Sequence, residues 1–198
     1  MKKMAKLRFL FYLAKVDGKL LDDILSLYSG LFPCNWGSEG YSHAEIWFPD
    51  SGGRFVDEED GSYCGITFSS TMRGDVNGTR FEIASVLLRH PERWDWIEIE
   101  VTKEQLELAH RVACEELGKK YDLLGILGFV IPGIYNPDDK WYCSEVVAYI
   151  AYRIWILNKH HTTISPRRLS KKINQVKEKQ QELRGLNDGL LLPPEDNI

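Results

Sequence analysis

A cysteine stands where an amphipathic helix is expected to begin, in the stretch from Lys140 to Val147. Apolar residues then recur every three or four positions, which predicts a helix with one buried stripe. The stripe comprises Val146, Val147, Ile150, Ala151 and Ile154. Because the first turn of a helix is the positive end of its macrodipole, it stabilises thiolate over thiol. Cys143 is therefore a candidate nucleophile, and the alternative is a small buried thiol that packs the helix terminus.

The rest of the chain predicts strands in the middle and helices mostly after them. Strand patterns occupy residues 7–13, 43–48, 54–58, 65–70, 80–84 and 96–101, and helix patterns occupy residues 20–31, 121–129 and 167–176. A capping box formed by Thr102 and Gln105 starts one further helix, whose expected stripe is Leu106, Ala109, Ala113 and Leu117. This order predicts an α+β fold with a central antiparallel sheet packed against helices.

Length and charge limit the possible classes of protein. The chain has 198 residues, so we expect one domain over residues 1–175 and a polar tail over 176–198. The net charge of −4 argues against a nucleic-acid partner, which would require a basic surface. Four scattered cysteines form neither a disulfide framework nor a zinc motif, so we expect reduced thiols and no metal or cofactor.

The hydrophobic segments argue against export and membrane insertion. Arg8 interrupts the first apolar run, and no small-residue cleavage site follows it, so we expect no signal peptide and a cytoplasmic protein. The longest apolar passage, residues 123–134, is too short and too rich in glycine for a transmembrane segment.

A nucleophilic cysteine requires a base, and histidine is the usual one because its pKa lies near working pH. Four of the five histidines are expected in polar loops or on an exposed helix face: His90, His110, His160 and His161. His43 differs because it begins a strand after a glycine-rich loop. It is the candidate base, and the alternative is a histidine at the edge of a sheet.

A third polar group would orient the imidazole. Glu45 shares a strand face with His43, but it lies about 6–7 Å away at Cα, which is marginal for a hydrogen bond. Asp57, Glu58 and Ser69 on the neighbouring segments are alternative third members.

Two motifs together carry a resemblance to a known group of proteins. Tyr41-Ser42-His43-Ala44-Glu45-Ile46 is followed about a hundred residues later by Trp141-Tyr142-Cys143-Ser144-Glu145-Val146-Val147. This pattern resembles the circularly permuted papain-like hydrolases, relatives of the NlpC-type cell-wall peptidases and of the lecithin:retinol acyltransferase group. Gly118–Asp122 and Ser165–Leu169 also agree with it, over roughly residues 5–175. The Ser42-His43-Ala44-Glu45 and Phe68-Ser69-Ser70 patterns, with Gly78-Thr79-Arg80-Phe81, more closely resemble versions from phages and large viruses.

The resemblance implies a permuted papain-like (NlpC-like) fold, with Cys143 as the nucleophile and His43 as the base. The backbone N–H of Cys143 would contribute to an oxyanion hole. In the family, the orienting residue comes from the strand after the histidine strand, where this chain has an acidic run instead of one clear match.

Several functions remain open at this point. The first is a cysteine hydrolase, such as an amidase or endopeptidase, that forms an acyl-enzyme on a peptide or on peptidoglycan stem peptides. Hydrolysis or transfer of a lipid acyl group is the alternative chemistry of the same fold. A non-enzymatic structural component, virion-associated in a phage-encoded protein, is another. A metal site of His43, Cys34 and Cys64 matches no standard zinc spacing.

Overall fold

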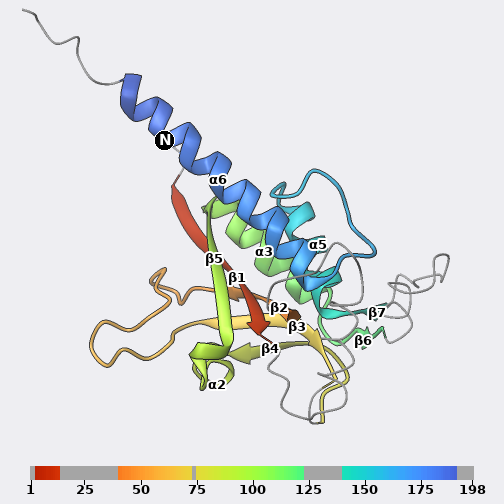
Figure 1. Cartoon of the computed structure of the whole chain (residues 1–198). Helices are drawn as coiled ribbons and strands as arrows, with labels where there is room; N and C mark the ends of the chain where they lie inside the picture. Colours follow the sequence, from red (N-terminus) through yellow and green to blue (C-terminus); the bar gives the residue numbers. More distant parts are fainter. Residues whose placement is uncertain (1–2, 14–39, 73–74, 123–139, 191–198) are drawn as a thin grey trace, which may run out of the picture.

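The structure, a computed structural model, describes residues 3–13, 40–72, 75–122 and 140–190. In this part of the chain, five antiparallel strands form one sheet in the order β4-β3-β2-β1-β5 (Figure 1). They are β1 (Met4–Leu13), β2 (Tyr41–Phe48), β3 (Ile66–Thr71), β4 (Gly78–Ile83) and β5 (Trp94–Thr102). The α+β class with an antiparallel sheet is confirmed.

Both faces of this sheet carry a cluster of buried side chains. Alternation along β2 directs Ala44, Ile46 and Phe48 into the larger core. Trp47 lies on the opposite face, in a smaller cluster with Leu10, Phe55, Ala84, Leu88 and Trp94. The face of β2 that carries His43 and Glu45 is therefore shielded from water by aromatic side chains.

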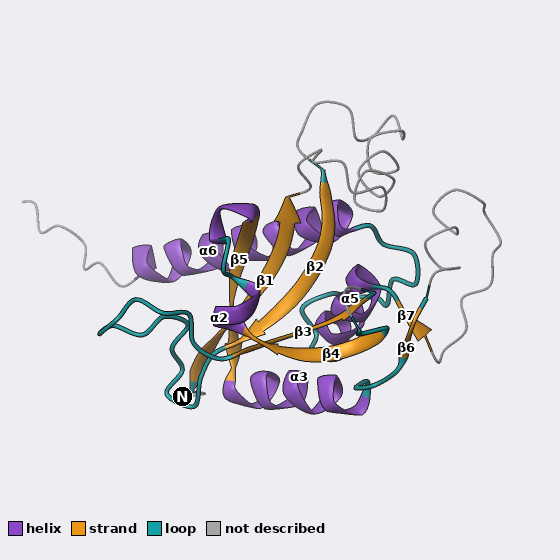
Figure 2. Cartoon of the chain, turned by 90° about the horizontal axis from the view of Figure 1, so that it is seen from below, coloured by secondary structure: helices purple, strands orange, loops and turns teal. Residues whose placement is uncertain are grey.

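Among the described residues, three helices cover the face of the sheet that carries the larger core (Figures 1 and 2). They are α3 (Lys103–Glu115), α5 (Cys143–Arg153) and α6 (Pro166–Leu190). The short α2 (Ala84–Leu87) contacts β3 and β4, and its Ala84 belongs to the smaller cluster. The capping box expected at the start of α3 is present, because Thr102 Oγ1 accepts from the Gln105 N–H and the Gln105 side chain accepts from the Thr102 N–H.

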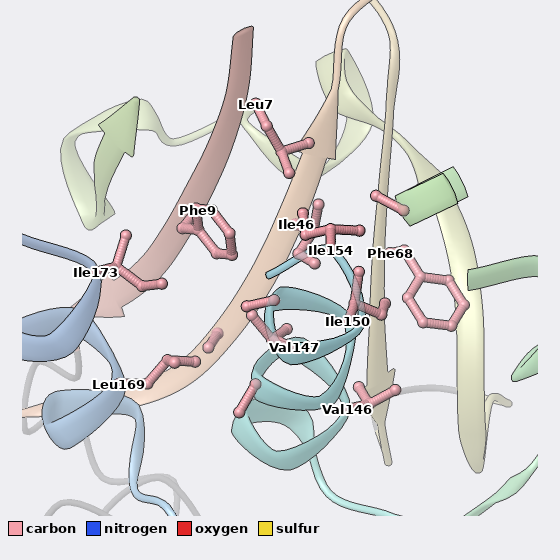
Figure 3. Close-up of a cluster of buried hydrophobic side chains, with 14 of the residues drawn as sticks. Leu7, Phe9, Ile46, Phe68, Val146, Val147, Ile150, Ile154, Leu169 and Ile173 are labelled. Carbon is pink, nitrogen blue, oxygen red and sulfur yellow. The ribbon is translucent and has the colours of Figure 1, made fainter. Parts of the chain in front are cut away.

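Helix α5 lies at the centre of the larger core. Its predicted apolar stripe is confirmed, since all five side chains are completely buried. Figure 3 shows four of them, Val146, Val147, Ile150 and Ile154, among side chains from β1, β2, β3 and α6. Burying an aliphatic side chain of this size stabilises a fold by about 1.5–3 kcal/mol, so this stripe holds Cys143 at a defined place.

Helix α6 is longer than predicted. The expected helix at 167–176 continues to Leu190, so most of the expected polar tail is helical. The reason lies in a tertiary contact. Gln180 accepts from the Glu100 N–H and donates to the Glu100 carbonyl on edge strand β5, and Arg184 pairs with the Glu100 carboxylate. Beyond this contact, α6 extends past the start of β1 (Figure 1).

Two other predictions were wrong. Residues 54–58 do not form a strand but a turn-rich segment with one isolated bridge, between Val56 and Tyr63. The Asp57 and Asp60 carboxylates accept from nearby backbone N–H groups, which favours turns over a ladder. Leu117 was expected in the stripe of α3 but is 51% exposed, because the helix ends at Glu115.

The predicted helix at 20–31 lies outside the described residues, as does most of the one at 121–129. Tyr121 itself belongs to β6 (Lys120–Tyr121), which pairs in parallel with β7 (Lys140–Trp141). A 3-10 turn, η2 (Pro91–Arg93), precedes β5.

Candidate active site

The site forms where β2 and β3 separate. The two strands pair only between Ile46–Phe48 and the first half of β3, so the beginning of β2 extends past the ladder. The start of α5 lies against this part of β2, which pairs with β1 but not with β3, because the backbone N–H of Ala44 bonds to the Cys143 sulfur. Ser69 Oγ donates to the Ala44 carbonyl over 2.6 Å and keeps β3 bonded to β2 next to the point where the two strands separate.

Cys143 is the first residue of α5 and is 5% exposed. The residue before it, Tyr142, provides no side-chain cap for the helix, and the first i to i+4 bond runs from the Val146 N–H to the Tyr142 carbonyl. The N–H groups ahead of that bond are left for other acceptors. One of them, from Ser144, bonds to the Cys143 sulfur.

The residues on either side of Cys143 are anchored to one segment. Tyr142 Oη accepts from the Ile164 N–H over 2.8 Å and donates to the Thr162 carbonyl over 3.1 Å. Ser144 Oγ donates to the Ile164 carbonyl over 2.6 Å. Burial raises the pKa of Tyr142, so its hydroxyl keeps the proton that it donates. These bonds fix the position of the cysteine without touching it.

A second anchor holds the strand before the cysteine. Ser70 Oγ donates to the Trp141 carbonyl, and Trp141 Nε1 donates to Glu116 Oε2, each over 2.6 Å. Glu116 also pairs with Lys119. These contacts connect the start of α5 to both β3 and the end of α3.

His43 lies opposite Cys143 and is 7% exposed. Its Nε2 lies 3.0 Å from Glu45 Oε1, and the ring also hydrogen-bonds the Cys143 thiol. Because Nε2 is occupied by Glu45, Nδ1 is the nitrogen left for the sulfur. The Trp94 ring packs edge-on against the imidazole, with centroids 6.2 Å apart.

The electrostatics of Cys143 and His43 favour an ion pair. Burial raises the pKa of the Cys143 thiol. The charge and hydrogen bond of His43 and two backbone N–H groups lower this pKa by a larger amount, so the net pKa falls below its usual value. Burial lowers the pKa of His43, but Cys143 and Glu45 outweigh burial, and the net pKa is raised. Both directions favour thiolate with imidazolium, the pair that a cysteine nucleophile needs.

Glu45 is a completely buried carboxylate. Burial raises its pKa, but hydrogen bonds and charges from His43 and Arg80 outweigh burial and bring the pKa to about 2. Arg80 Nη2, from β4, lies 2.9 Å from Glu45 Oε1. The carboxylate therefore stays ionised between two cationic partners.

Of the four predicted third members, only Glu45 contacts His43 in the described contacts. Glu58 is exposed in a turn, and Asp57 pairs with Arg54 at 3.6 Å in the same loop. Ser69 is completely buried and bonds to the backbone of β2. The marginal Cα separation did not prevent the contact, because both side chains leave the same strand face and extend toward each other.

Sequence reasoning did not assign Arg80 to the site. The signal was indirect: a carboxylate on a shielded strand face requires a cation, and Arg80 is on the next hairpin, opposite Ser69 in register. Only the order of the strands shows that Arg80 and Glu45 share a face.

The contacts of the other described thiols give little support to the alternative metal site of His43, Cys34 and Cys64. Cys64 donates weakly to the Ser62 carbonyl, and Cys114 is exposed with its sulfur 3.8 Å from His110 Nδ1. Cys34 lies outside the described residues. Among the described residues, no group of three or more His, Cys, Asp or Glu side chains converges as metal ligands would.

No protein-family model matches this chain, and neither the curated proteins nor the solved structures contain a match to it. Within the described part of the chain, none of the helices combines the length and the apolar character needed to cross a bilayer.

Proposed function

We propose that this protein is a cysteine hydrolase that cleaves an amide bond through an acyl-enzyme, with a permuted papain-like fold. The observation that carries the proposal is the hydrogen-bonded chain from Cys143 through His43 to Glu45 at the N-terminus of a buried helix. The histidine strand precedes the cysteine helix, the order that the permuted enzymes have. This order supports the family relationship.

In the first step, the Cys143 thiolate attacks the substrate carbonyl and a carbon–sulfur bond forms. Negative charge then develops on the carbonyl oxygen, and backbone N–H groups in the first turn of α5 are suited to stabilise it. His43, as the imidazolium, donates its proton to the leaving amine, and the carbon–nitrogen bond breaks. Glu45 accepts the other ring N–H and keeps the imidazole oriented.

In the second step, water resolves the acyl-enzyme. His43, now neutral, takes a proton from the water as the oxygen attacks the thioester carbonyl. The carbon–sulfur bond breaks, the product acid leaves, and the thiolate–imidazolium pair is restored. Replacement of water by another nucleophile would make the same site an acyltransferase.

A peptidoglycan stem peptide is our leading substrate class, on the resemblance to cell-wall peptidases, and a lipid acyl group is the alternative. The ion pair makes the proposed chemistry testable without a known substrate. We expect iodoacetamide to alkylate Cys143 at pH 6 at least tenfold faster than Cys34, Cys64 or Cys114, because His43 and backbone N–H groups lower the pKa of the Cys143 thiol and so raise its thiolate fraction. Peptide mapping by mass spectrometry measures the four rates.

Accessibility alone predicts the opposite order for two of these thiols, because Cys114 is exposed and Cys143 is 5% exposed. His43→Ala should slow alkylation of Cys143 by about tenfold or more. His110→Ala, which removes the histidine beside Cys114, is the matched control and should leave Cys143 unchanged. Alkylation of Cys143 no faster than that of Cys114, and insensitive to His43→Ala, would refute the enzyme and favour a structural role.

Substrate class is then tested by trapping. The full chain is mixed with peptidoglycan stem peptides or with acyl-lipid esters, quenched in acid, and measured by intact mass. We expect an acyl adduct on Cys143 with the stem peptides, and none in Cys143→Ser under the same quench. An adduct formed only by the lipid esters would replace the amidase with an acyl hydrolase.

A further inference from the structure

The buried carboxylate of Glu45 has two cationic neighbours, and one of them, Arg80, has no part in the proposed chemistry. Glu45 is on β2 and Arg80 is on β4, so the arginine side chain crosses β3 to reach it. Ser69 is the register partner of Arg80 on β3. A small side chain at that position leaves room for the crossing.

The ion pair is close to dry. Glu45 is completely buried and the Arg80 side chain is 16% exposed. Glu45 Oε2 and Arg80 Nη1 are also buried and have no hydrogen-bond partner in the structure. A buried ion pair held by one contact is weak evidence for a role in stability, since apolar residues of similar volume are often as stable. The pair is better explained by a role toward the neighbouring histidine.

The charges alternate along the site. Cys143 as thiolate, His43 as imidazolium, Glu45 as carboxylate and Arg80 as guanidinium form a row of four, each paired with the next. Without the guanidinium, the buried row would carry a net negative charge. Glu45 would then bind a proton or repel the thiolate, and either change makes the thiolate less favourable.

We propose that Arg80 is a positioning residue of this site, which keeps Glu45 ionised and aimed at His43 so that Cys143 is held as the thiolate. This inference depends on the proposed function. Arg80 touches neither the sulfur nor the imidazole in the described contacts, so it would act through Glu45.

Both uncharged and titratable groups surround the row. From β1, Leu10 and Tyr12 lie opposite Glu45 and His43, and β5 contributes Trp94. The Tyr12 hydroxyl accepts from Arg93, which carries a further positive charge on that side. On α5 the titratable group in the first turn is Glu145, which is itself buried.

The test is a double-mutant cycle read out by alkylation of Cys143 in the full chain from pH 4 to pH 9. We expect Arg80→Met to raise the pH midpoint by about one unit, which slows alkylation about tenfold at pH 6. Arg80→Lys keeps the charge but not the planar geometry, so about a threefold loss is expected. In a Glu45→Gln background, Arg80→Met should change the rate by less than about twofold, because the residue through which it acts is absent.

Arg8 provides the matched control. It lies on β1 with a side chain that is 17% exposed, and it pairs with Glu98 over 3.0 Å on the same face of the sheet. Arg8→Met and Arg8→Lys should leave the pH midpoint unchanged. They report what loss of a similar ion pair does to the sheet as a whole.

The outcomes are distinct. Cys143 that is unreactive in the wild type refutes the proposed function. Reactive Cys143 with an unchanged midpoint in Arg80→Met overturns the role of Arg80, and so does an equal loss in both backgrounds, which would mean that Arg80 acts directly or through the fold. If Arg80→Met does not fold, Arg80→Lys decides: a rate at pH 6 equal to that of wild type overturns the inference.

Discussion

At the residue scale, the site depends on a carboxylate that water does not reach. Glu45 is completely buried, yet His43 and Arg80 bring its pKa to about 2. A carboxyl whose pKa is lowered on folding stabilises the fold above its unfolded pKa, and that contribution is lost as the pH falls toward its folded pKa. For Glu45 the window runs from about pH 4.5 down to about pH 2.

This window gives a prediction for acid stability. Between pH 7 and pH 3, the wild type should lose about 2 kcal/mol of unfolding free energy through Glu45 alone. Glu45→Gln has no titrating group at this position, so it should lose that much less over the same range. Urea unfolding at both pH values measures the difference. Glu107→Gln changes an exposed carboxylate of α3 and should follow the wild type. An equal loss in wild type and Glu45→Gln would contradict the assigned pairing.

At the element scale, the position of Cys143 depends on what holds the first turn of α5. The apolar stripe places the helix against the sheet, but the polar bonds of Tyr142 and Ser144 to the 162–164 segment set its start. Burial of the apolar stripe sets how deeply α5 lies in the core, whereas these directional hydrogen bonds fix the rotation and register of its first turn.

We therefore expect Tyr142→Phe to affect both stability and reactivity. The change leaves the Ile164 N–H and the Thr162 carbonyl without their partner, which should cost about 1–3 kcal/mol in unfolding free energy. The rate of Cys143 alkylation at pH 6 should fall severalfold, since the sulfur would lose its fixed place opposite His43. Thermal unfolding and peptide mapping measure the two effects.

Tyr152→Phe is the matched control, because Tyr152 is on the same helix and is 38% exposed. It should lower neither the unfolding temperature nor the alkylation rate. A loss in Tyr142→Phe that is no larger than in Tyr152→Phe would show that the hydroxyl does not anchor the helix.

At the scale of the whole molecule, α6 closes the edge of the sheet. Strand β5 is the last in the sheet order, and the Gln180 amide pairs with both backbone groups of Glu100, as a neighbouring strand would. Exposed strand edges favour association with other chains, so this contact protects the edge as well as anchoring the helix.

Gln180→Ala should therefore lower the unfolding free energy by about 1–2 kcal/mol through two lost hydrogen bonds. It should also increase self-association, measured by light scattering at rising concentration. Gln181→Ala is the control, because Gln181 is exposed on the same helix. Equal stability and equal scattering in the two variants would show that the Gln180 contact is not significant.

Much of this molecule follows from local patterns. Alternation and heptad-like spacing predict β1, β2, β5 and the buried face of α5, and the capping box predicts the start of α3, because these signals depend only on neighbours along the chain. The same local logic selected Cys143 and His43 as candidates. Local patterns failed at residues 54–58, where aspartate-to-backbone bonds favour turns. They also failed at α6, where the contact of Gln180 with Glu100 on β5 stabilises a helix longer than its apolar pattern predicts.

The carboxylate partner of His43 and its counter-ion could be recognised only from the tertiary fold. Four residues competed as the partner of His43, and sequence spacing left Glu45 marginal. The tertiary structure decided among them, because it buries Glu45 beside His43 and the strand order brings Arg80 across β3 to neutralise it. The amino-acid sequence thus selected the two candidate groups of the proposed reaction, since helix and strand patterns place them locally. Their ionisation depends on burial and on charges from distant strands, which exist only when the chain is folded.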